Sequence, residues 1–235
     1  MKSLFFFTLI LLVVNTKSYC QDANKQYFIS TYIGTIQYYG DLNEQESNLD
    51  IRHYFEIKDP LFGFCIGKKL SPYFNTQLTL EGGNFKAFKN SINLSTTTSF
   101  YQITQRIEMD IFNLTHRGIP FEKQRFNNYL YVGVGMNGFK SYANELDNDM
   151  SLRRANDTKF VLSYGIVFKF KLNSNTALKL DFGHNKVYSD IFDATIDGNN
   201  DDLGKVKDKK ISSYRTALDM WAGLRVGVVF NLGKK

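Results

Sequence analysis

Hydrophobic and polar side chains alternate along many stretches of this chain. In residues 101–112, YQITQRIEMDIF, the charged residues Arg106, Glu108 and Asp110 occupy every second position, and large apolar residues lie between them. Successive side chains of a β-strand point to opposite faces of the sheet. The pattern therefore predicts a strand with one charged face and one apolar face.

The same alternation recurs along the 235-residue chain and predicts eight strands and no amphipathic helix. The predicted strands are approximately Tyr27–Tyr39, Leu61–Lys69, Tyr73–Gly83, Phe100–Asn113, Asn128–Phe139, Lys159–Leu172, Thr176–Asn185 and Ala217–Leu232. Several of them reach about ten residues, which is the length a tilted strand needs to cross a bilayer. The 21 Phe and 14 Tyr residues, against only 3 Pro, also favour strands.

The charged face of these strands also carries many glycines. They are Gly63, Gly67, Gly133, Gly135, Gly165, Gly183, Gly223 and Gly227. Large charged side chains beside glycines suit the interior of a narrow barrel, whereas a solvated outer face gives no steric reason for them. We therefore predict an all-β, eight-stranded antiparallel up-and-down transmembrane β-barrel whose apolar face contacts outer-membrane lipid.

Charges inside so narrow a barrel are tolerated only when they pair with one another. The predicted interior charge network consists of Arg106, Glu108, Asp110, Lys179, Asp181 and Arg225, with Asp219 as a further member. Because these charges fill the lumen, passive diffusion of nutrients is not expected.

The connections between the predicted strands differ in length on the two sides. Four long connections, at roughly 40–60, 84–99, 140–158 and 186–216, fall on one side. Long extracellular loops and short periplasmic turns are typical of outer-membrane barrels. Aromatic residues near strand ends are predicted to form the interfacial girdles: Tyr27, Phe28, Tyr38, Tyr39, Phe112, Tyr129 and Tyr131.

A soluble lipocalin-like barrel is the main structural alternative. It would place the apolar residues inside, around a ligand. It does not explain the glycines on the charged face or the one-sided distribution of long loops, so the membrane barrel is favoured.

The N-terminus has the features of an export signal. Lys2 provides a positive charge, Leu4–Val14 is an apolar run too short to span a bilayer, and Cys20 precedes the predicted cut. We predict a signal peptide over residues 1–20 and a barrel domain over residues 21–235, located in the outer membrane.

Cysteine usage excludes several kinds of site. A lipid anchor on Cys20 is the alternative to cleavage, but Lys17 and Tyr19 do not match a lipobox. After cleavage only Cys65 remains, so no internal disulfide forms. The three histidines are far apart in the sequence, and no cofactor is predicted. Cleavage removes Lys2 and Lys17 and lowers the net charge from +6 to 27 − 23 = +4, which is too small and too scattered to indicate nucleic-acid binding.

Five features resemble a known family. They are the signal ending before Gln21, YIGTIQYYGDL at 32–42, NNYLYVGVGMNGF at 127–139, FGHNKVYSDIFDA at 182–194 and LRVGVVFNLGKK at 224–235. The chain resembles the small, OmpA-barrel-like outer-membrane β-barrel proteins of Bacteroidota. Among these it is similar to the PorG-type barrels associated with type IX secretion. The resemblance implies an outer-membrane location and a periplasmic or secretion-machinery partner.

Two loops contain candidate sites of chemistry. Ser47, Asp50, His53 and Asp59 form the alternative in which the first extracellular loop makes the barrel a surface enzyme. Nothing in the sequence fixes a nucleophile beside a base, so a non-enzymatic protein is predicted.

The second loop is a candidate calcium site at Asp193, Asp197 and Asp201. Gly204 stands where an EF-hand loop requires a bidentate carboxylate. A solvated acidic turn is therefore favoured over a metal site.

The predicted function is a structural or accessory role in which the barrel docks a partner. The connection at 114–127 is long for a periplasmic turn, and its Ile119, Pro120 and Phe121 are flanked by basic residues. A small apolar anchor within a polar rim is a reasonable docking patch. The loop at 186–216 is the second candidate, on the external side.

Overall fold

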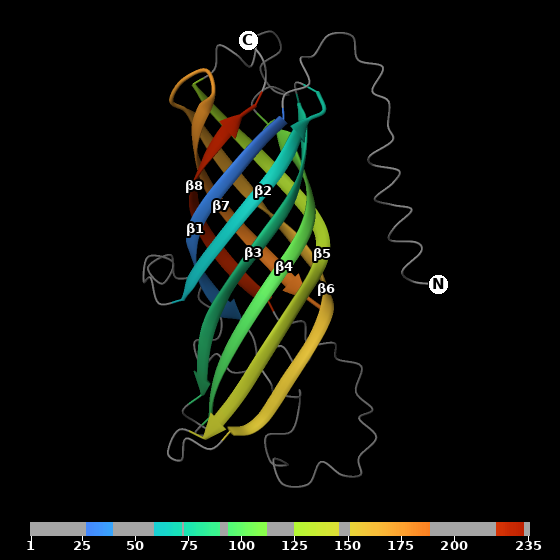
Figure 1. Cartoon of the computed structure of the whole chain (residues 1–235), viewed down its shortest axis with the longest axis vertical. Coiled ribbons are helices and arrows are strands. Elements are labelled where there is room, and N and C mark those ends of the chain that lie inside the picture. Colours follow the sequence, from blue (N-terminus) through green and yellow to red (C-terminus); the bar gives the residue numbers. More distant parts are fainter. Residues whose placement is uncertain are drawn as a thin grey trace, which may run out of the picture.

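The chain folds into a closed β-barrel of eight strands (Figure 1). The computed structural model describes residues 27–39, 59–71, 73–89, 94–111, 125–145, 151–188 and 220–232. The strands are β1 (Tyr27–Tyr39), β2 (Pro60–Lys69), β3 (Phe74–Lys89), β4 (Leu94–Asp110), β5 (Phe126–Glu145), β6 (Ser151–Lys171), β7 (Thr176–Val187) and β8 (Met220–Asn231). Within these described ranges, no helix is long and apolar enough to cross a membrane.

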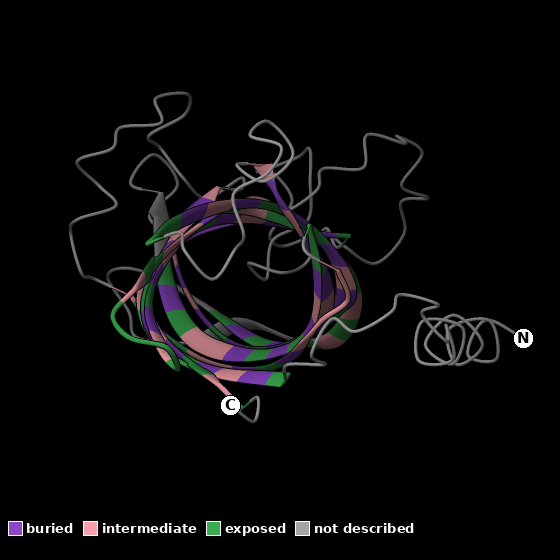
Figure 2. Cartoon of the chain, turned by 90° about the horizontal axis from the view of Figure 1, so that it is seen from above, coloured by how far each residue is buried: buried purple, intermediate pink, exposed green. Residues whose placement is uncertain are grey.

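Each strand pairs antiparallel with the next, and β8 pairs with β1. This arrangement confirms the predicted eight-stranded antiparallel up-and-down barrel. Figure 2 looks along the barrel and shows the closed wall, with buried and exposed residues alternating along each strand. The closure leaves no sheet edge around the barrel itself, so backbone groups are paired on both sides of every strand there.

The two faces of the wall have the polarity that the alternation predicts. Arg106, Glu108 and Asp110 are fully buried inside the barrel, whereas Ile107 between them is 44% exposed on the outside. The soluble alternative required the opposite arrangement, with apolar side chains lining the interior and polar ones outside.

Four strands are much longer than the sequence pattern predicted. β3 to β6 contain 16, 17, 20 and 21 residues, against 10 to 13 for the other strands. The predicted long loops at 84–99 and 140–158 were therefore wrong. These stretches are rich in hydroxyl and amide side chains and lack hydrophobic contrast, but their backbones continue the ladder, for example from Asn84 to Ser99.

Beyond Gly83 the strand β3 pairs only with β4, and before Phe160 the strand β6 pairs only with β5 among the described residues. The four long strands consequently continue past one end of the barrel as a sheet (Figure 1). We call this part the projecting sheet: residues 84–89, 94–99, 139–145 and 151–159.

The predicted aromatic girdle was partly wrong. Tyr27 is exposed on the outer face, but Phe28, Tyr38, Tyr129 and Tyr131 are buried in the interior. Position near a strand end does not decide which face a side chain occupies, since each strand alternates faces along its whole length.

Candidate functional site

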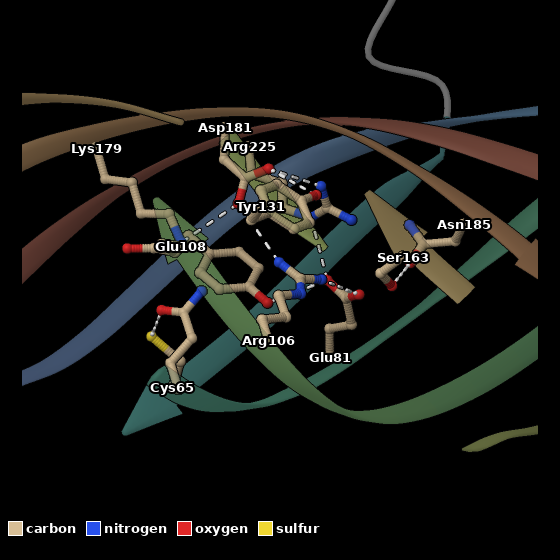
Figure 3. Close-up of polar contacts among 12 residues, drawn as sticks. Cys65, Glu81, Arg106, Glu108, Tyr131, Ser163, Lys179, Asp181, Asn185 and Arg225 are labelled. Atoms are coloured by element: carbon tan, nitrogen blue, oxygen red, sulfur yellow. Dashed lines mark hydrogen bonds and ion pairs between the residues drawn. The ribbon is translucent and has the colours of Figure 1, made fainter. Parts of the chain in front are cut away.

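The middle of the barrel interior contains a cluster of buried ion pairs (Figure 3). Arg225 on β8 contacts Glu81 on β3 at 3.1 Å (Nε to Oε2) and Asp181 on β7 at 3.0 Å (Nη1 to Oδ1). Arg106 on β4 contacts the same two carboxylates, at 2.9 Å for Glu81 and 3.5 Å for Asp181. We call these four residues the charge cluster; all four side chains are fully buried.

Lys179 and two tyrosines complete the surroundings of the charge cluster. Lys179 Nζ lies 3.3 Å from Asp181 Oδ2. The Tyr32 hydroxyl donates to Glu81 at 3.0 Å, and the Tyr131 hydroxyl donates to Asp181 at 3.3 Å. Each carboxylate therefore receives both cationic and neutral donors, which is the condition under which a charge can be buried.

Glycines make room for these tyrosines. A Cβ at residue 63 would overlap the Tyr32 ring, and a Cβ at residue 183 would overlap the Tyr131 hydroxyl. Both positions face the interior, where two large rings and two guanidinium groups already compete for space. At these two contacts the interior glycines have the predicted role, which is to leave space for large side chains in a narrow lumen.

All six residues of the network predicted from the sequence are buried in the barrel interior. Arg106, Lys179, Asp181 and Arg225 come together in or beside the charge cluster. Glu108 instead pairs with Lys169 at 2.5 Å.

Asp110 is fully buried on the same inward face of β4 as Arg106. It accepts a hydrogen bond from the side chain of Asn127 at 3.0 Å. It lies four residues from Arg106 along β4, which places it well toward the end of the barrel. Asp219 lies outside the described residues.

Sequence reasoning missed Glu81 and Lys169 as members of the interior network. Both occupy the polar phase of their strands, Glu81 beside Thr79 on β3 and Lys169 beside Lys171 on β6. Their place in the alternation of polar and apolar residues identified both as interior positions. It did not reveal that Glu81 contacts Arg225, which is 144 residues away.

A neutral polar layer borders the charge cluster. Gln102 donates through Nε2 to Glu81 at 2.8 Å and to Asn185 at 2.9 Å, and it accepts from Asn137 at 3.0 Å. Ser163 donates to Asn185. These side chains come from four strands and fill the lumen next to the ion pairs.

An apolar layer follows on the side of the projecting sheet. It consists of buried side chains from all eight strands: Ile36, Tyr38, Leu61, Phe85, Phe100, Phe139, Val161, Val187 and Trp221. The rings of Tyr38 and Phe85 stack at 4.7 Å, and those of Phe100 and Trp221 lie 5.0 Å apart. The interior is thus closed twice, once by charges and once by aromatic residues.

The described residues offer little for catalysis or metal binding. They contain no group of three or more His, Cys, Asp or Glu side chains placed to hold a metal ion. Cys65 is buried, and its sulfur lies 3.4 Å from the amide oxygen of Gln77.

Several candidate residues lie outside the described part of the chain. These are Ser47, Asp50 and His53 of the first loop, Asp193, Asp197 and Asp201 of the calcium candidate, and Ile119, Pro120 and Phe121 of the docking turn. The roles of these residues remain predictions from the sequence.

The chain matches no known family model and no curated protein sequence. Among solved structures it is similar to Ail, the attachment invasion locus protein of Yersinia pestis, with a TM-score of 0.48 at 11% identity, covering 89% of this chain and 99% of that one. Neisserial surface protein A (NspA) gives 0.48 at 10% identity, with coverages of 87% and 96%. The N-terminal β-barrel domain of Pseudomonas aeruginosa OprF gives 0.41 at 14% identity, with coverages of 87% and 97%. These likenesses to small outer-membrane barrels concern the fold alone.

Proposed function

We propose that this chain is a non-enzymatic outer-membrane β-barrel with a closed lumen, which presents the projecting sheet outside the membrane as a docking platform. The observation that carries the proposal is the inverted polarity of the wall. Arg106, Glu108, Asp110, Asp181 and Arg225 are inside and fully buried, while large apolar side chains cover the outside of the wall.

The outer surface supports a location in lipid. Ile33, Phe62, Val132 and Val226 are each more than half exposed. In water such a continuous apolar surface costs about 25 cal/mol per Å² of exposed apolar area, whereas lipid removes that cost. The strands β1, β2, β7 and β8 also have 10 to 13 residues, close to the 9 to 11 that a tilted transmembrane strand requires.

The filled interior supports a role other than a diffusion channel. An eight-stranded barrel has an interior just wide enough for side chains to fill. Here the charge cluster and the layer around Phe100 and Trp221 both cross the lumen. Function is therefore expected at the parts of the chain outside the membrane.

The projecting sheet supports docking on the external side. A barrel that only anchored itself would not need strands of 16 to 21 residues, because about ten suffice to cross. A stiff four-stranded extension presents a defined surface, unlike a flexible loop. The turn containing Ile119, Pro120 and Phe121 remains the candidate for a periplasmic partner, and the loop at 186–216 a second external candidate.

A more specific function for this protein is participation in protein secretion. It is supported by the PorG-like segments at 32–42 and 182–194 of the sequence. A secretion component would use the periplasmic turn rather than the projecting sheet. The test compares secreted proteins in a strain lacking the gene with strains whose 114–127 turn is replaced by a Gly/Ser linker. Unchanged secretion after gene deletion would remove this assignment.

The membrane location is tested with a charge placed in the apolar wall. Ile166 faces outward on β6 and is 40% exposed, with Phe160 and Phe170 on the same face to either side. Ile166→Arg is expected to cost roughly 2–4 kcal/mol of folding stability in vesicles, because Arg near the midplane is desolvated. Asn156→Arg, outward on the same strand but in the projecting sheet, is the matched control.

Folding into phospholipid vesicles is followed by heat modifiability on a gel. Equal folding of both variants would contradict a membrane-spanning wall.

Docking is tested by shortening the projecting sheet. Phe85 pairs with Thr98, and Ser141 pairs with Ala155. Each hairpin is therefore closed at these pairs with an Asn-Gly turn, which suits two-residue connections. The shortened barrel is expected to insert normally but to lose cross-linked external partners. Retention of every partner by an inserted, shortened barrel would overturn the docking role.

A further inference from the structure

The outward face of β3 to β6 changes character in successive rows toward the projecting sheet. Each row contains directly paired residues of the four strands. The first row is apolar: Leu80, Ile103, Met136 and Phe160. The second row is mixed: Gly82, Tyr101, Gly138 and Thr158. The third row is polar and basic: Asn84, Ser99, Lys140 and Asn156. The apolar wall therefore ends at a definite level, and hydrogen-bonding side chains follow it.

Tyr101 marks the border between the two zones. It is 67% exposed and points away from the lumen. An added Cβ at Gly138 would overlap the Tyr101 ring, so this ring lies flat along the wall over β5. A tyrosine with an apolar ring and a polar hydroxyl is typical of the level where hydrocarbon meets headgroups.

Two exposed lysines stand on the polar side of this border. Lys140 lies in the third row, and Lys86, which pairs with Thr97, lies one row further out. At the outward positions of β3 to β6 whose side chains are described, no Asp or Glu occurs. The carboxylates whose side chains are described on these strands face inward: Glu81, Glu108, Asp110 and Asp157. Over the described part of these strands, the outer face therefore carries positive charge and no carboxylate.

The geometry points to the phosphate groups of outer-leaflet lipid headgroups as the ligand of this face, which we call the lysine face: Asn84, Lys86, Ser99, Lys140 and Asn156. This inference rests on the proposed membrane location. A lipid whose chains lie against Met136 and Phe160 has its headgroup at the level of the lysine face. There the two ammonium groups attract its phosphates, and the hydroxyl and amide groups donate hydrogen bonds. Anionic lipids bound in this way would lie in an ordered row along the outer face at the base of the projecting sheet.

The test uses diphosphoryl lipid A and dephosphorylated lipid A as probes. The full chain is refolded into phosphatidylcholine nanodiscs containing a small fraction of one probe and then extracted in mild detergent. The probe retained per barrel is measured by mass spectrometry. The double variant K86Q/K140Q is expected to retain less diphosphoryl lipid A, with about a fivefold loss per lysine. K86R/K140R keeps both charges and should retain it.

The matched control is K68Q/K159Q, which removes the same charge elsewhere. Lys68 is on β2 near the opposite end of the barrel, and Lys159 faces inward and pairs with Asp157. Specific loss in K86Q/K140Q, seen only with the phosphorylated probe, supports the lysine face. Equal loss in the control, or equal retention of the dephosphorylated probe, overturns it. If the wild-type chain does not become heat-modifiable in nanodiscs, the proposed membrane function fails instead.

Discussion

The charge cluster and the apolar layer both close the same lumen, but they are built in opposite ways. The charge cluster contains four ionised groups whose contacts are shared, since each guanidinium contacts both carboxylates. The apolar layer contains rings and aliphatic side chains that contact one another without directional bonds. The first arrangement depends on every member, whereas the second depends mainly on filled volume. The two layers should therefore respond differently to single substitutions.

Removing one cation from the charge cluster is expected to have the largest effect. Arg225→Met leaves Glu81 and Asp181 short of a partner in a fully buried site. The expected loss is roughly 3–5 kcal/mol of unfolding free energy, measured by urea denaturation in vesicles.

The informative control removes the whole set of charges. The combined variant E81Q/R106M/K179M/D181N/R225M eliminates the charges of the charge cluster and of Lys179 together. It should be less destabilised than Arg225→Met alone, because no unpaired charge remains at the position of the charge cluster. A loss equal to the sum of the single losses would mean that the charges act independently.

In the apolar layer, the loss of unfolding free energy should depend on how much side-chain volume a substitution removes. Leu61 is fully buried there, and Leu61→Ala is expected to cost roughly 3 kcal/mol through lost burial and the remaining cavity. The same unfolding measurement on Leu61→Met should show less than about 1.5 kcal/mol, because the volume is nearly conserved. Equal losses for Ala and Met would indicate that packing volume does not govern this layer.

A glycine next to the charge cluster tests how tightly the side chains around the cluster are packed. Gly183→Ala places a methyl group against the Tyr131 hydroxyl and is expected to cost about 1–3 kcal/mol. Gly82→Ala, on the outward face, meets no atom closer than 3.2 Å and should cost less. Adding Tyr131→Phe to Gly183→Ala should recover part of the loss. No recovery in that double variant would place the strain elsewhere.

The smallest effect is expected at an ion pair outside the filled lumen. Asp157 and Lys159 lie 2.7 Å apart on the projecting sheet, with more than a third of each side chain exposed. Exposed pairs contribute roughly 0–1 kcal/mol, so Asp157→Asn should change stability by less than about 1 kcal/mol. A loss as large as that of Arg225→Met would contradict the view that burial makes the charge cluster sensitive.

The sequence by itself determined the barrel, its strand number and its inside-out polarity. Strict alternation, as around Arg106, Glu108 and Asp110, assigns side chains to two faces with no tertiary information, because the strand period is two. Glycines on the charged face then indicated which face is enclosed. The same reasoning failed for residues 84–99 and 140–158, where hydroxyl and amide residues on both faces hide the period.

Only the tertiary structure decided which charges meet. Closing the barrel brings β3 beside β2 and β4 and places it across the lumen from β7 and β8. Glu81 on β3 therefore contacts Gln102 on the neighbouring β4 and Arg225 on β8. Gln102 in turn donates to Asn185 on β7. Height along the barrel separated Asp110 from Arg106, although both share one face of β4. Alternation specifies a face but neither a height across the lumen nor a partner, and both of those follow from the register of eight strands closed into a ring.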